Sequence, residues 1–291
     1  MTVLESVPNF SEGRDRETIE AIGAALASAA RVLDVHVDAD HHRSVFTVVG
    51  EGDALVEALA AGVSVAVERI DLRLHEGVHP RIGAADIVPI VPFEPGDFGE
   101  ADRVARNVGA RLAALGLPVF LYAPPERGPA FYRRGGLAAL EARLGAGKLA
   151  PDFGEGNLHP TAGGVIVGAR GPLIALNVNL RGDAAVARAV ARAVRERDGG
   201  LPGVRALGLD LPRAGVVQVS MNIEDWVASP PHVVVGRVAA EAEARGAEVL
   251  GSELVGLMPA GAAAAAAGSA LRIEGFDLSR VLELRLADSS P

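Results

Sequence analysis

The sequence predicts an α/β (α+β) protein built from two ferredoxin-like β-α-β-β-α-β subdomains. Two observations lead to this prediction: strand-like and helix-like patterns follow the same order twice, and the 49% hydrophobic and 22% charged residues are the balance of an ordinary globular chain. Each such sheet has one face bare of helices. We therefore expect the two bare faces to pack together or to line a substrate cleft.

The first 92 residues contain the pattern once. Residues 33–38 alternate with period two, which predicts a strand with Leu33, Val35 and Val37 on the core face and Asp34, His36 and Asp38 on the other. Pro89 indicates that its strand lies near a sheet edge. The expected strands are 3–7, 33–38, 45–49 and 87–91. One helix is expected to begin at about Asp15, whose carboxylate suits an N-cap, and a second helix is expected at about 53–69.

The pattern returns after residue 170. The expected strands are 173–180, 204–211, 216–223 and 248–257, with helices at 183–197 and 230–245. Between the two repeats we expect helices at 99–115 and 137–144, a strand at 118–122 and a glycine-rich loop at 152–164. The predicted domains are therefore residues 1–170 and 171–291.

Polar residues follow two strands of the second repeat. Gln218, Ser220 and Asn222 share one face of a strand, and Asn177 and Asn179 do the same on another. Such rows are compatible with a solvated outer face or with a ligand-facing surface.

The charge balance of 28 − 37 = −9 argues against a nucleic-acid partner or a polybasic membrane contact. No apolar run reaches the roughly 18 residues of a membrane span, and the N-terminus lacks the features of a signal peptide. The chain has no cysteine, which excludes disulfides, thiolate nucleophiles and cysteine-ligated metals. We expect a cytoplasmic protein.

Residues 75–79 satisfy the H-E-x-x-H pattern of zinc peptidases, but Gly77 and Pro80 disfavour the helix that this site needs. We therefore do not expect a zinc site here. Residues 40–43 are interpreted as a hairpin turn, with a metal-binding tract as the alternative. A histidine beside carboxylates is suited to acid–base catalysis. His75 and His79 are therefore candidates, because their loop is expected near Asp34 and Asp38. The alternative is a histidine that forms hydrogen bonds only within its own loop.

The same residues carry a family resemblance. The run from His75 to Asp86 resembles the H-x-G-x-H-P-R-x-G-A-x-D signature of glutamate formimidoyltransferases, the transferase part of formimidoyltransferase-cyclodeaminase. Further similar segments lie at 7–13, 43–47, 151–154, 167–170, 173–179, 218–222 and 251–257. The resemblance covers the chain from end to end and stops where the transferase part stops, which implies that no cyclodeaminase domain is fused to it.

The resemblance implies transfer of a formimidoyl group between N-formimidoyl-L-glutamate and the co-substrate tetrahydrofolate, in histidine breakdown and one-carbon metabolism. It also implies two subdomains facing a substrate tunnel, a homodimer, no metal, and His79 as the catalytic acid–base. The folate-contacting loop corresponds to Gly154, Glu155, Gly156, Asn157, Leu158, His159, Pro160, Thr161, Ala162 and Gly163. Departures from the family pattern include His159 in this loop, and His42 where the family commonly has asparagine.

The chemistry assigns further roles. Asp34 and Asp38 are expected to support the ring of His79 and the cationic amidine, and Arg43 and Arg81 to bind substrate carboxylates. Two alternatives stay open: a glutamate formyltransferase that uses 5-formyltetrahydrofolate, and a folate-binding module without turnover.

Overall fold

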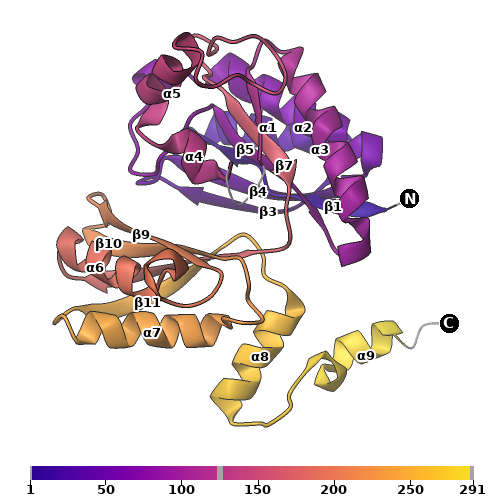
Figure 1. Ribbon diagram of the computed structural model, residues 1–291. Coiled ribbons are helices and arrows are strands. Elements are labelled where there is room, and N and C mark those ends of the chain that lie inside the picture. Colours follow the sequence, from indigo (N-terminus) through magenta and orange to yellow (C-terminus); the bar gives the residue numbers. More distant parts are fainter. Residues whose placement is uncertain (1, 123–126, 289–291) are drawn as a thin grey trace. The chain divides into compact units, whose positions relative to one another are not determined.

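The structure is a computed structural model that describes residues 2–122 and 127–288, with side chains up to residue 285. The chain forms two compact units, Met1–Gly171 and Pro172–Pro291. Each unit has its own sheet and its own hydrophobic core (Figure 1).

The sheet of the first unit has the strand order β3-β4-β1/β2-β5-β7-β6, because the short strands β1 and β2 share the place between β4 and β5. Strands β5, β6 and β7 run parallel to one another, and the other pairs are antiparallel. The strands are β1 (Val3–Ser6), β2 (Asn9–Phe10), β3 (Arg31–Asp38), β4 (Arg43–Glu51), β5 (Ala85–Pro92), β6 (Val119–Leu121) and β7 (Val165–Ala169).

Three helices cover one face of this sheet (Figure 1): α1 (Arg16–Leu26), α2 (Gly52–Arg69) and α3 (Phe98–Ala113). Helix α1 begins where the sequence predicts it, because the Asp15 carboxylate accepts the Glu17 N–H, and it buries Ile19, Ile22 and Leu26. Helices α4 (Pro129–Arg133) and α5 (Gly136–Gly145) belong to a second cluster with Phe120 and Ile166. Because neighbouring side chains of a strand point to opposite faces, β6 and β7 are covered on both sides.

The predicted core face of β3 is wrong. Leu33, Val35 and Val37 are 38, 43 and 44% exposed, whereas Asp34, His36 and Asp38 are half-buried. Strand β3 is the edge of the sheet and pairs only with β4, so its apolar side chains lie beyond the helix layer. Val35 and Val37 line an open groove of about 470 Å³ beside α1 instead of the core.

The edge position expected from Pro89 is also wrong, since β5 lies inside the sheet between β1/β2 and β7. The proline is tolerated because it stands opposite the break between β1 and β2, where no ladder hydrogen bond is lost. Its carbonyl accepts the Ser6 hydroxyl at 2.7 Å. Strand β7 is an element that the sequence analysis missed.

The second unit repeats the order of elements of the first. Its four-stranded sheet has the order β11-β8-β10-β9, which corresponds to β5-β1-β4-β3 of the first unit. The two ferredoxin-like β-α-β-β-α-β patterns predicted from the sequence are therefore confirmed. The elements are β8 (Ile174–Arg181), α6 (Ala184–Val194), β9 (Val204–Leu211), β10 (Val216–Ile223), α7 (Pro231–Glu243) and β11 (Glu248–Val255).

Beyond this repeat the chain continues through α8 (Ala260–Leu271) to α9 (Leu282–Asp288). No helix among residues 2–122 and 127–288 combines the length and the apolar character that a membrane span requires.

Candidate active site around His79

The loop that carries His79 is not helical. Residues 75–81 follow the 3-10 turn η1 (Leu72–Leu74) as an irregular segment that contains Pro80. His75 and His79 therefore do not project from successive turns of a helix, as the zinc-peptidase pattern needs, and that pattern is not a zinc-peptidase motif here.

Arg81 fixes this loop to the turn that joins β3 to β4. Its guanidinium donates to the carbonyl oxygen of His41 at 2.6 Å, to that of His42 at 3.0 Å and to that of His79 at 3.0 and 3.1 Å. These bonds occupy the N–H groups that were expected to bind a substrate carboxylate. The structure instead gives Arg81 the role of holding the His79 loop in place.

His79 is held as a neutral imidazole. Nη1 of Arg43 lies 3.1 Å from Nε2 of His79, and because a guanidinium only donates, Nε2 is the acceptor and Nδ1 carries the proton. Burial, followed by the charges of Arg43 and Arg133, lowers the pKa of His79 well below its ordinary value of 6.5. The ring also stacks on His41, with centroids 5.7 Å apart.

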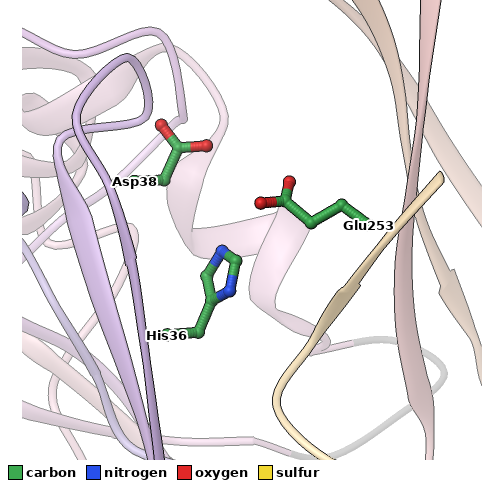
Figure 2. Close-up of side chains that lie close together, drawn as sticks. All are labelled: His36, Asp38 and Glu253. Atoms are coloured by element: carbon green, nitrogen blue, oxygen red, sulfur yellow. The ribbon is translucent and has the colours of Figure 1, made fainter. Parts of the chain in front are cut away.

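Of the two predicted carboxylates, Asp38 lies at the turn and Asp34 in the middle of β3, and among the described residues neither is hydrogen-bonded to His79. Oδ1 of Asp38 accepts the N–H groups of Asp40 and His41 at 2.8 and 2.7 Å, and its Oδ2 lies 3.9 Å from Nε2 of His41. Asp38 thus shapes the turn and faces the histidine that stacks on His79. Figure 2 shows His36 and Asp38 on the same side of β3, and the period of the strand places Asp34, opposite Thr47, on that side too.

The predicted folate loop is hydrogen-bonded to the part of the signature that follows His79. The Gly164 N–H donates to the Ile82 carbonyl at 2.9 Å, and the Ala84 N–H to the Ala162 carbonyl at 2.8 Å. A Cβ atom at Gly83 would lie 1.9 Å from the carbonyl oxygen of Gly164, so only glycine allows this approach. The structure therefore brings the His79 loop and the far end of the 154–163 loop together.

His159 has a local structural role. Its Nδ1 accepts the Ala162 N–H at 3.0 Å and the Thr161 N–H at 3.4 Å, which closes the turn that ends at Gly163. Gly154, Glu155, Gly156, Asn157 and Pro160 are exposed.

Two charged residues that the sequence analysis did not assign to the site complete it. The carboxylate of Asp86, 3% exposed, accepts the Ile82 N–H at 2.7 Å and pairs with Arg133 of α4. Asp86 is the last residue of the signature and could have been assigned to the site from the sequence. Nothing in the sequence indicates Arg133, which lies 47 residues away.

His42 stands in a backbone conformation that suits few residues. Its φ of +49° lies in the left-handed region, where asparagine is favoured among residues other than glycine. This explains the asparagine that the resemblance led us to expect at this position. Nδ1 of His42 accepts the Gly13 N–H at 3.2 Å, and its ring lies 3.9 Å from that of His75, measured between centroids.

The polar rows of the second unit form hydrogen bonds across strands. Nε2 of Gln218 donates to Oδ1 of Asn179 at 2.9 Å, and Nδ2 of Asn177 donates to Oε2 of Glu253 on β11 at 3.3 Å. The face opposite α6 and α7 is therefore an ordered amide and carboxylate surface.

Comparison with known proteins agrees with this arrangement. Residues 3–170 match the family model of the formiminotransferase domain, N-terminal subdomain, and residues 175–281 match that of the formiminotransferase domain. The chain belongs to this family. The resemblance found in the sequence is thus confirmed.

The relatives include proteins of similar length. The chain is 39% identical over 300 residues to the glutamate formimidoyltransferase of Thermoplasma acidophilum and 37% identical over 294 residues to that of Streptococcus pyogenes, each time covering 98% of both chains. It is also 38% identical over 272 residues to the formimidoyltransferase-cyclodeaminase of Gallus gallus, covering 88% of this chain and 50% of that protein.

Three histidines of this site predict a loss of stability in acid. Burial, with the charges of Arg81 and His42, lowers the pKa of His75 to about 4, and burial lowers the pKa of His42 and His79 in the same direction. In the unfolded chain these rings take up protons near pH 6.5. Stability is therefore fully present above pH 6.5 and falls as the pH drops toward 4.

Since one pKa unit corresponds to about 1.4 kcal/mol and His75 is half-buried, we expect a loss on the order of 1–2 kcal/mol from this group. Urea unfolding at pH 7.5, 6 and 5 measures it, with the variant His75→Gln as the comparison. The variant is expected to show a shallower pH dependence than the wild type. Parallel curves would show that His75 is not a source of the effect.

Proposed function

We propose that this protein is a glutamate formimidoyltransferase, which transfers a formimidoyl group between N-formimidoyl-L-glutamate and tetrahydrofolate with His79 as general acid–base. The observation that carries the proposal is the neutral imidazole of His79 held in the family's signature loop. The name shared by the two relatives of matching length supports the same reaction.

The proposed reaction needs one group that accepts a proton and returns it. The N5 amine of tetrahydrofolate attacks the formimidoyl carbon and passes its proton to His79, giving a tetrahedral intermediate. The bond from that carbon to the glutamate nitrogen then breaks, and this nitrogen receives the proton from His79. The lowered pKa keeps the ring neutral at pH 7, which is the protonation state that a base needs before the reaction.

The other site residues support this proposal in separate ways. The 154–163 loop, which is bonded to the His79 signature, is proposed to contact folate. Asp34 and Asp38 supply negative charge on one side of β3, which suits a cationic amidine. Arg43 is proposed to bind a substrate carboxylate.

We further propose a cytoplasmic homodimer in which each chain has two formiminotransferase subdomains, residues 1–170 and 171–291. The partners are small molecules, tetrahydrofolate and glutamate derivatives, with no nucleic acid, membrane or metal in the reaction.

A transfer assay tests the reaction. Purified protein is incubated with N-formimidoyl-L-glutamate and tetrahydrofolate, and separately with 5-formyltetrahydrofolate and glutamate. We expect turnover that depends on tetrahydrofolate in the first mixture. Turnover in the second mixture alone would change the transferred group to formyl, and folate binding without turnover in either would indicate a binding module.

A further inference from the structure

The contact between Arg43 and His79 occupies the atom that a catalytic base needs. Arg43 opens β4, directly after the turn whose carbonyls bind Arg81. Its Nη1 donates to Nε2 of His79 at 3.1 Å, so the ring lone pair is engaged. In this state His79 has only the Nδ1 proton to offer and cannot accept one at Nε2.

Arg43 itself is a cation without a paired carboxylate. Among the described residues its hydrogen-bond partner is His79, and no carboxylate oxygen lies within the 4.0 Å of a salt bridge. Burial and the charge of Arg133 lower its pKa to about 10. None of its nitrogen atoms is among the fully buried polar atoms that lack a partner in the described part of the chain, so no N–H group of Arg43 is left both fully buried and without an acceptor.

The two neighbouring arginines already have strong acceptors within the protein, although Nε of Arg133 is buried without a partner among the described residues. Arg81 donates to three backbone carbonyls, and Arg133 pairs with the buried carboxylate of Asp86. Of these three guanidinium groups around His79, Arg43 is the one whose described acceptor is a single neutral ring, which it can exchange for an anionic ligand. A carboxylate is the stronger acceptor, because it carries charge and can accept two parallel N–H bonds.

We propose that a carboxylate of the glutamate substrate activates His79 by drawing Arg43 away from its Nε2. This inference rests on the proposed function. It adds that recognition of the substrate carboxylate by Arg43 decides whether Nε2 of His79 can accept a proton. Without substrate the base is blocked, and it becomes active only when the correct ligand has taken up Arg43.

The exchange balances at each step. The hydrogen bond from Nη1 to Nε2 breaks and Arg43 forms hydrogen bonds to the carboxylate, with no change in protonation. Nε2 then accepts the proton of the attacking amine as the new carbon–nitrogen bond forms. The same proton leaves Nε2 for the glutamate nitrogen as the old bond breaks, which restores the neutral ring with its proton on Nδ1.

Nuclear magnetic resonance of the histidine rings tests the first step without turnover. The ¹⁵N signals of His79, assigned with the variant His79→Gln, are followed against pH with and without saturating L-glutamate. We expect glutamate to raise the pKa of His79 toward 6.5 and to shift the Nε2 signal as its donor leaves. Failure of glutamate to bind, or binding that leaves this titration unchanged, would overturn the proposal.

Two variants distinguish the specific effect of Arg43 on His79 from the effect of removing any positive charge. In Arg43→Gln the pKa of His79 is expected to be raised already without ligand, with no further rise on adding glutamate. Arg106→Gln removes an arginine of α3 that pairs with exposed Asp102, and it is expected to behave as the wild type. The same response in wild type and Arg43→Gln would contradict the proposed role.

Substrate analogues test the coupling during turnover. N-Formimidoyl-4-aminobutyrate lacks the α-carboxylate and N-formimidoyl-2-aminobutyrate lacks the γ-carboxylate. We expect loss of the critical carboxylate to lower kcat roughly tenfold or more in the wild type, and this difference to disappear in Arg43→Gln. If the wild type transfers the formimidoyl group from neither N-formimidoyl-L-glutamate nor the two analogues, the proposed function fails. The titration of the His79 ring still decides whether a carboxylate draws Arg43 away from it. Equal kcat for all three compounds would overturn the coupling alone.

Discussion

Replacing His79 by alanine is expected to lower kcat for formimidoyl transfer by roughly 10²–10⁴. The reaction needs one proton to be removed from the attacking amine and delivered to the leaving nitrogen, and His79 is the neutral imidazole proposed for both steps. Folate binding should persist, because the 154–163 loop is bonded to the backbone of Ile82 and Ala84 rather than to the ring. Steady-state kinetics and tetrahydrofolate titration of the same variant measure the two effects.

A matched control removes an imidazole elsewhere. His232 lies in α7 of the second unit, outside the residues proposed for the reaction, and His232→Ala is expected to keep its kcat. Partial recovery of His79→Ala by added imidazole would support a role in proton transfer rather than in folding. A fully active His79→Ala protein would remove His79 from the mechanism.

Much of the fold could be predicted because local patterns decide it. Apolar spacing placed α1, and Asp15 fixed its beginning. The second repeat could be predicted equally well, because the expected strands 204–211 and 216–223 coincide with β9 and β10. Strand β7 was missed because residues 165–169 are a short apolar run buried on both faces, without the alternation that marks a strand.

The roles within the site were harder to predict, since they depend on partners far apart in the sequence. His79 could be found from its signature, but its bond to Arg43 joins residues 36 positions apart. Arg81 looks like a substrate-binding group in the sequence, and only the folded turn shows the carbonyls of His41 and His42 within its reach. The exposure of Val35 has another cause: its side chain lies on the face that carries α1, but β3 is the edge strand and no helix of the described residues reaches over it.

Replacing Asp86 by alanine is expected to destabilise the first unit by about 3–5 kcal/mol. The carboxylate is 3% exposed, and its loss leaves the Ile82 N–H and the guanidinium of Arg133 without their acceptor in a buried setting. Asp86→Asn is expected to cost less, because an amide oxygen can still accept the Ile82 N–H but brings no charge to Arg133. Urea unfolding at pH 7.5 measures both changes.

The exposed pair of Asp102 and Arg106 on α3 gives the comparison for this prediction. Their contact of 2.9 Å is of similar chemistry, but the two side chains are 49 and 58% exposed, so Asp102→Ala is expected to cost less than about 1 kcal/mol. Equal losses for Asp86→Ala and Asp102→Ala would show that burial does not strengthen the Asp86 pair. A larger loss for Asp86→Ala than for both Asp86→Asn and Asp102→Ala would show that the buried carboxylate holds Ile82 and Arg133 in place through its two contacts.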